Sequence, residues 1–188
     1  MKDFQIWEQL PFGLKAYSTL SYEERVQFDE WQQYTRLSLD NARERIIRLL
    51  LKQDLDKAID VLTDTLAKTH PQYFAVERHF FLTDAIDKFY AMRDVNPRSV
   101  DLCLGICDLD IMNLHNYIEE AGHADFYAIS PTRSAIILEK QGRIDEAIEM
   151  CDKAIDLQVL DSNKQLFTVR KEKLQKKLEK QKLKNQNK

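Results

Sequence analysis

The sequence predicts an all-α protein, and three observations support that fold class. Only four glycines and four prolines occur in 188 residues, below the average usage of roughly 7% and 5%, so few residues suit the tight turns of a sheet. Charged residues make up 31% of the chain, a share typical of exposed helix sides. Apolar residues recur at helical spacing, most clearly over residues 135–155, where two short amphipathic segments flank one turn. Such a unit cannot bury its apolar side alone, so we expect an array of antiparallel helical hairpins.

The N-terminal region predicts an arm followed by a capped helix. Residues 1–20 carry several aromatic side chains around a proline and a glycine, and we expect them to form an irregular arm that packs on the body. Ser21 and Glu24 have the spacing of a capping box, in which each side chain accepts a hydrogen bond from the other residue's backbone N–H. A helix should therefore run over residues 22–37.

A helical hairpin is expected next. Residues 38–41 contain Ser, Asp and Asn and offer a new helix start, and the apolar residues of 42–51 form a broad stripe. Residues 53–56 interrupt this pattern, and residues 58–66 begin a second apolar side. The hairpin should end at His70–Pro71, because proline cannot continue a helix.

The middle of the chain predicts further helices separated by polar residues. Residues 73–92 contain no glycine or proline and form either one long helix or two helices broken at Thr83–Asp84. Pro97 ends this segment, because the residue before a proline disfavours the helical conformation. Two more helices are expected on either side of a turn at residues 108–110, and the second should end at Gly122.

Three helices are expected in the C-terminal third. Ser130 and Pro131 mark the start of the first, since a proline in the first helical turn loses no hydrogen bond. Gly142 ends that helix in a tight turn, and residues 144–157 form its partner. Asp161–Ser162 should start the last helix.

Residues 128–161 resemble a tetratricopeptide repeat, a helix–turn–helix unit of about 34 residues. Ala135, Ala147 and Ala154 stand at the positions where the two helices of such a repeat approach closely and need small side chains. The turn around Gly142 is also similar to that of the family. The resemblance implies a right-handed superhelix of hairpins with a C-terminal capping helix.

The resemblance is degenerate in several places. Cys151 stands where an aromatic residue is usual, and Val159 stands where proline is usual. Two weaker matches occur elsewhere, over residues 84–99 through Ala85, Phe89 and Pro97, and over residues 42–70 through Ala58. We therefore expect a single repeat-like helical domain over residues 1–169 rather than a regular array.

Charge is unevenly distributed along the chain. Residues 170–188 hold nine lysines and arginines against two glutamates, so this segment, expected to be a partly frayed helix or tail, carries about +7. The whole chain has 28 basic and 31 acidic residues, which leaves residues 1–169 near −10. An acidic body argues against broad nucleic-acid binding, which depends on neutralising many phosphates. The basic tail alone could bind nucleic acid weakly.

No motif for catalysis or cofactor binding is recognisable. The four glycines stand alone, so the sequence has neither a phosphate-binding loop nor a nucleophile elbow. Cys103 and Cys107 lie one helical turn apart and could present two thiolates to a metal, with His115 and His123 further along the chain. Two ligands do not make a site, and the apolar neighbours of both cysteines favour core packing. We expect no metal, no cofactor and no enzymatic activity.

The sequence gives no sign of export or of a membrane span. The N-terminal residues mix charges with apolar side chains, and no apolar run approaches the roughly 18 residues that a membrane helix needs. Three cysteines, an odd number, fit a reducing compartment better than a disulfide framework. A cytoplasmic location is therefore expected.

These observations predict a non-enzymatic adaptor or scaffold that binds a protein or peptide partner. The family resemblance implies that the first helix of each hairpin lines the binding side, which points to Thr132, Ile136, Glu139 and Lys140, with Arg43 from the first hairpin. The alternative is a nucleic-acid-associated regulator that uses the basic segment over residues 170–188. A homo-oligomer is compatible with both, and the sequence does not identify the partner.

Overall fold

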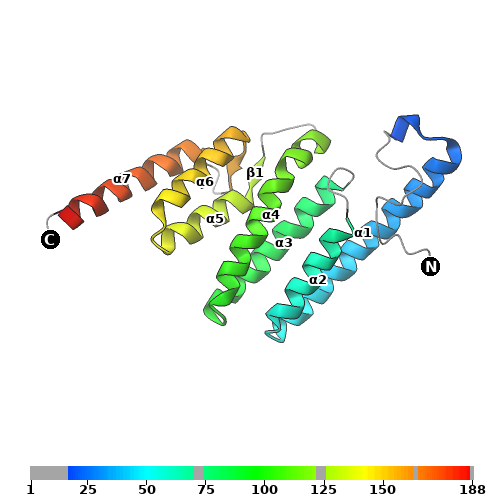
Figure 1. Cartoon of the computed structure of the whole chain (residues 1–188), viewed down its shortest axis with the longest axis horizontal. Coiled ribbons are helices and arrows are strands. Elements are labelled where there is room, and N and C mark those ends of the chain that lie inside the picture. The colour runs from blue at the N-terminus through cyan, green and yellow to red at the C-terminus, as the bar shows by residue number, and fades with distance from the viewer. Residues whose placement is uncertain (1–16, 70–73, 122–125, 163–164, 187–188) are drawn as a thin grey trace. The chain divides into compact units, whose positions relative to one another are not determined.

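The computed structural model describes residues 17–69, 74–121, 126–162 and 165–186 (Figure 1). Across these ranges the chain forms seven α-helices and one pair of two-residue strands, which confirms the all-α prediction. It divides into two compact units, Met1–Phe81 and Leu82–Lys188, and we consider each unit by itself. Most of the expected aromatic arm, together with His70–Pro71 and Gly122, lies outside the described residues.

The first unit is built on α1 (Tyr22–Leu51), a single helix of 30 residues. The capping box at its start is confirmed, because the Ser21 hydroxyl accepts from the Glu24 N–H at 3.2 Å and the Glu24 carboxylate accepts from the Ser21 N–H at 2.8 Å. The helix break expected at residues 38–41 is wrong. Buried residues continue through that segment at spacings of three and four, so one side of the helix stays on the core: Phe28, Trp31, Thr35, Leu39, Ala42, Ile46 and Leu50.

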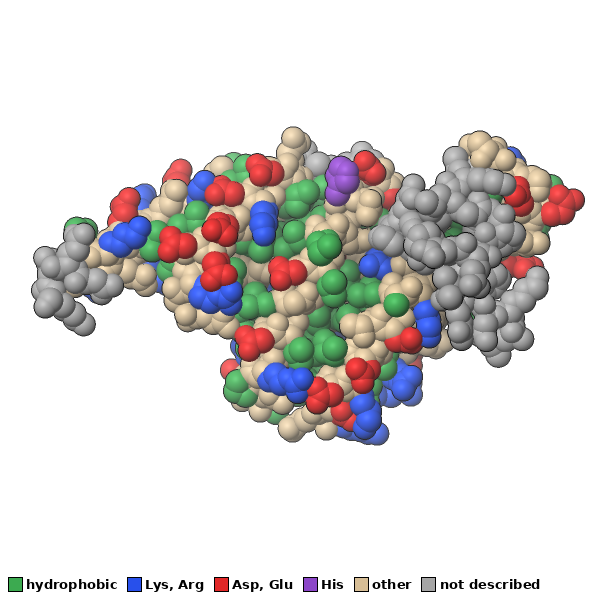
Figure 2. Space-filling model, viewed as in Figure 1, with side chains coloured by type: hydrophobic (Ala, Val, Ile, Leu, Met, Phe, Trp, Pro, Cys, Tyr) green, Lys and Arg blue, Asp and Glu red, His purple; other side chains and the backbone are tan. Residues whose placement is uncertain are grey.

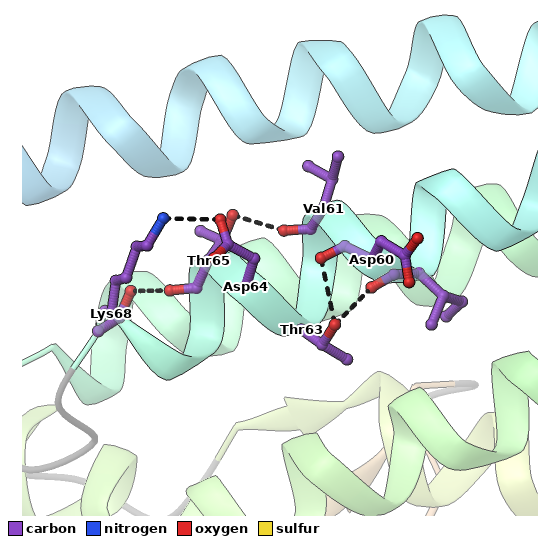
Figure 3. Close-up of polar contacts among 8 residues, drawn as sticks. Asp60, Val61, Thr63, Asp64, Thr65 and Lys68 are labelled. Atoms are coloured by element: carbon purple, nitrogen blue, oxygen red, sulfur yellow. Dashed lines mark hydrogen bonds and ion pairs between the residues drawn. The ribbon is translucent and has the colours of Figure 1, made fainter. Parts of the chain in front are cut away.

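α2 (Leu55–Ala67) follows as the second helix of the predicted hairpin and packs against α1. The chain reverses at Gln53, whose φ of 59° places it in the left-handed region, and the Asp54 side chain caps the new helix. Figure 3 shows how this helix satisfies a buried hydroxyl: Thr65 donates to the carbonyl of Val61 at 2.6 Å. The hydroxyl of Thr65 is therefore buried without losing its hydrogen bond.

α3 (Ala75–Ala91) is one continuous helix, so the alternative of two helices broken at Thr83–Asp84 is excluded. Phe74, just before it, packs edge-on against Trp31 with ring centroids 4.8 Å apart, and both rings are fully buried. The Arg78 guanidinium donates to two carbonyl groups at the end of α2. Burial lowers the pKa of Arg78 to about 10, so the group remains charged at neutral pH and ties the two helices together.

The second unit contains the end of α3, the short 3-10 helix η3 (Met92–Asp94) and α4 (Arg98–Ala121), a helix of 24 residues. The turn expected at residues 108–110 is wrong. At Gln53 a left-handed residue reverses the chain, whereas no described residue of α4 has a positive φ. The buried side of α4 instead runs through this segment without a change of direction: Cys103, Ile106, Cys107, Asp110, Asn113, Leu114 and Tyr117.

α5 (Ile129–Lys140) and α6 (Ile144–Asp156) form the hairpin that the sequence predicts most clearly. Gly142 joins them with a φ of 79°, a conformation that favours glycine. Ala135, Ala147 and Ala154 are 0% exposed and belong to one hydrophobic cluster. Their burial agrees with the expectation that small residues lie where the two helices meet.

A short strand pair that the sequence does not predict closes this hairpin at its base. β1 (Tyr127–Ala128) and β2 (Leu160–Asp161) pair in parallel, and the Leu160 N–H donates to the Phe126 carbonyl at 2.9 Å. The chain segments that enter and leave the hairpin therefore lie side by side.

α7 (Phe167–Gln186) packs against α6 through Phe167 and Leu174. The predicted helix start at Asp161 is wrong because Asp161 belongs to β2, and its fully buried carboxylate pairs with Arg170 instead of capping a helix. Arg170, at the start of the basic segment, is thus part of the folded unit. Of the helices in the described ranges, none combines the length and apolar composition that crossing a membrane requires.

Candidate functional site

The exposed side of α5 carries the residues that most resemble a binding surface. α5 turns one side to the core. Beyond Ile129, its first residue, four side chains remain at least partly accessible, and we call them the α5 strip: Arg133, Ile136, Glu139 and Lys140. Spacings of three and four residues place these side chains on one side of the helix. The strip therefore combines two cations, one carboxylate and one apolar side chain.

Toward α3, the α5 strip meets a group of cations around one aromatic ring, the Tyr90 cluster. The guanidinium carbons of Arg133 and Arg93 lie 4.1 Å and 4.6 Å from the centroid of the Tyr90 ring, and the Lys140 ammonium lies 5.8 Å from it. Lys140 also donates to the Tyr90 hydroxyl at 3.1 Å. The negative face of the ring favours such positions for cations, and Asp87 pairs with Arg133 at 2.8 Å.

Toward α7, the α5 strip continues into a row of lysines. Glu139 pairs with Lys177 at 2.8 Å. Residues on the same side of α7 as Lys177 recur at spacings of four, three and four, and we call them the α7 lysine row: Lys173, Lys177, Lys180 and Lys184. Polar contacts thus join α5 to α3 on one side and to α7 on the other.

Comparison with models of protein families, with curated proteins and with solved structures found no match.

Of the residues that the sequence predicts for partner binding, Ile136, Glu139 and Lys140 lie together on the α5 strip. Thr132, in contrast, is buried, with only 3% of its surface exposed. Its hydroxyl donates to the Ala128 carbonyl and accepts from the Ser162 N–H, at 2.8 Å and 3.0 Å. Thr132 therefore holds the base of the hairpin, and we leave it out of the candidate surface.

Arg43 belongs to the first unit and has a separate setting. It lines a shallow groove of about 240 Å³ between α1 and α3, with Phe80 exposed beside it. Arg43 pairs with Asp40 at 3.1 Å, and Arg36 pairs with Glu77 at 2.7 Å across the two helices. The groove thus contains one exposed aromatic ring, that of Phe80, and charged side chains that pair with one another.

The sequence misses most of the Tyr90 cluster. Arg93 and Arg133 lie 40 residues apart, and neither stands in a recognisable motif. Tyr90 is visible in the sequence only as part of an aromatic-rich segment. The helical spacing of Arg133 relative to Ile136 and Lys140 is the one signal that could have added it to the candidate residues.

The second unit has a hollow of about 210 Å³ among α4, α5 and α6, and its lining includes Asp108, Arg143 and Glu146. Arg143 and Glu146 form two contacts, at 2.6 Å and 2.5 Å. Their mutual hydrogen bonds raise the pKa of Arg143 and lower the pKa of Glu146. Arg143 and Glu146, two of the charged residues that line this hollow, therefore neutralise each other.

The cysteine pair that the sequence raises as a metal candidate is packed in the core. Cys103 and Cys107 are both 0% exposed, and the Cys103 thiol donates to the Ile86 carbonyl at 3.5 Å. Burial, followed by the neighbouring Cys103 thiol, raises the pKa of Cys107 well above its usual range. A thiol held in its neutral form is a poor ligand and a poor nucleophile. Within the described ranges, no three His, Cys, Asp or Glu side chains gather as a metal site would require.

Proposed function

We propose that the chain is a non-enzymatic, tetratricopeptide-like interaction module, and that the α5 strip with its flanks on α3 and α7 contacts a segment of a protein partner. The observation that carries the proposal is the set of contacts that joins alternate helices. Arg133 reaches Asp87 of α3, Lys140 reaches Tyr90 of α3, and Glu139 reaches Lys177 of α7.

Three features of the second unit support this proposal. Contacts between alternate helices are expected when helical hairpins stack, because the first helices of successive hairpins then lie beside each other. The alanines Ala135, Ala147 and Ala154 are fully buried in the α5–α6 hairpin, where the family resemblance needs small residues. α7 covers α6 with Phe167 and Leu174 and exposes lysines, as a capping helix should. The right-handed superhelix stays a prediction.

The chemistry of the α5 strip is that of a recognition surface. Aromatic rings and arginines are enriched where proteins bind one another, because they combine contact area with directed hydrogen bonds. Tyr90 is half-buried and held by three cations, so it loses little conformational freedom on binding. Three free and buried cysteines are compatible with the expected cytoplasmic location.

The proposal is tested by comparing three immobilised proteins in native lysate. These are the wild-type chain, Ile136→Gln on the α5 strip, and Glu149→Gln, which is exposed on α6. We expect at least one protein to be retained by the wild type and by Glu149→Gln but to be lost with Ile136→Gln. Circular dichroism shows whether all three remain folded. Retention of the same proteins by all three, or no reproducible retention by the wild type, would refute the proposal.

The basic segment is less available to nucleic acid than its composition suggests. Arg170, Lys171 and Lys177 form ion pairs with Asp161, Asp152 and Glu139 inside the unit. Nucleic-acid affinity depends on the number of phosphates that free cations neutralise. The nucleic-acid alternative therefore depends on the remaining lysines of α7.

A further inference from the structure

The surface formed by the α5 strip, the Tyr90 cluster and the α7 lysine row has more cations than the fold neutralises. Arg93 and Arg133 each have a carboxylate partner, Asp94 at 3.3 Å and Asp87 at 2.8 Å. Lys140 instead donates to the Tyr90 hydroxyl and has no carboxylate within ion-pair distance in the described part of the chain. The same holds, within that part, for three members of the row: Lys173, Lys180 and Lys184.

We propose that this surface binds an acidic peptide segment, one rich in aspartate or glutamate, from the partner protein. The inference rests on the proposed function and names the chemistry of the partner. Lys140 and the unpaired lysines of the α7 row would donate to its carboxylates, while Tyr90 and Ile136 would contact the apolar parts of its side chains. Charge complementarity of this kind sets both the specificity and the rate of association.

The dimensions of the surface suit a short extended peptide. Lys173 and Lys184 are eleven residues apart on α7, which corresponds to about 16 Å along the helix axis. An extended chain rises about 3.3 Å per residue, so about five residues span this distance. Alternate side chains of such a segment point the same way, about 6.6 Å apart. Successive lysines of the row are about 4.5–6 Å apart along the helix axis, within reach of these side chains.

A carboxylate-bearing peptide fits this surface better than a nucleic acid does. Asp87, Asp94 and Glu139 interrupt the cations and would repel a continuous line of phosphates. The other side of the α5–α6 hairpin is acidic: Figure 2 shows acidic side chains gathered where Figure 1 draws α6. A peptide can place single carboxylates between the surface acids, whereas a nucleic-acid backbone cannot omit its charges.

The experiment measures fluorescence anisotropy of a labelled probe peptide of about twelve residues, in which glutamate alternates with alanine, against the full chain. The matched probe has glutamine in place of every glutamate. We expect the glutamate peptide to bind at least about tenfold more tightly than the glutamine peptide at low salt, and to weaken steeply at roughly 0.5 M salt.

Charge-reversal variants locate the binding surface. Lys140→Glu and Lys180→Glu should each weaken binding of the glutamate peptide about tenfold or more. The control is Lys153→Glu on α6, which is exposed like the others and makes the same change of charge. It should alter the dissociation constant by less than about twofold, because Lys153 lines the separate hollow among α4, α5 and α6 and would act on the peptide only through screened interactions.

Three results would overturn the inference. The first is equal binding of the glutamate and glutamine peptides, or equal effects of all three variants. The second is a single-stranded oligonucleotide of the same charge that binds more tightly and is lost with Lys180→Glu, which would assign the surface to nucleic acid. The third is self-association of the wild type, seen by sedimentation and lost with Lys140→Glu, which would assign it to a second copy.

The two proposals fail in different ways. If a lysate partner depends on Ile136 but the glutamate peptide does not bind, the acidic-peptide inference is wrong and the interaction module stands. If the peptide binds as expected but no protein is retained through Ile136, the proposed function is wrong and the chemistry of the surface stands.

Discussion

Ala147→Leu should destabilise the second unit through the contact between α5 and α6. Ala147 is 0% exposed, and Ala135 and Ala154 in the same cluster are also 0% exposed, so the packed side of the hairpin has no free space for a larger group. Leucine replaces a methyl group with an isobutyl group and forces the helices apart. Overpacking of this kind costs about 1–3 kcal/mol of unfolding free energy.

The measurement is urea denaturation followed by circular dichroism. With a slope of about 1–3 kcal/mol per molar urea, the expected loss lowers the midpoint by roughly 1 M. Glu149→Leu makes a change of similar size on the exposed side of α6 and should cost no more than about 0.5 kcal/mol. If the two units unfold separately, only the transition that includes α6 should move. Equal midpoints for the two variants would show that the hairpin packing is misread.

The remaining predictions concern buried polar groups and thiols. Arg170→Met should cost about 3–5 kcal/mol in urea denaturation, because it removes the cationic partner of the buried Asp161 carboxylate. Adding Asp161→Leu should recover much of this loss, and an Arg170→Met variant as stable as the wild type would contradict the ion pair. Cys103, Cys107 and Cys151 are buried, so Ellman's reagent at pH 8 should label no thiol in the native protein and all three in guanidinium chloride. Burial raises the pKa of Cys151 to about 11, so the unfolded thiol ionises first, near pH 8.5. The unfolding free energy should therefore fall between about pH 8.5 and 11, by up to about 1.4 kcal/mol per pH unit for this thiol, and the slope should be shallower in Cys151→Ala.

Local patterns in the sequence predict most of the helices and two hairpins, α1–α2 and α5–α6, because those features depend on neighbouring residues. The capping box at Ser21 and the turn at Gly142 each depend on a backbone requirement that a specific residue type meets. The two wrong helix breaks, at residues 38–41 and 108–110, come from polar residues that are compatible with a helix interior. A break needs a residue that can reverse the chain, such as Gln53, or a change in the buried side.

Parts of the candidate site could not be predicted because they depend on contacts across the fold. Ile136 and Lys140 follow from helical spacing and the family resemblance. The gathering of Arg93 and Arg133 on Tyr90 depends on how α3 lies against α5, which no local pattern encodes. The pairing of Arg170 with Asp161 likewise turns a residue of the basic segment into part of the core.

The pairing of β1 with β2 determines where the α5–α6 hairpin can take an insertion. Because Tyr127 lies beside Leu160, the segment that leads into α5 is paired with the segment that follows α6. The α5–α6 hairpin is therefore a loop whose two ends lie together. Residues added at the Gly142 turn would extend the far end of that loop without moving α4 or α7. The hairpin can thus be lengthened at its turn, whereas its sides that pack on α4 and α7 must be kept.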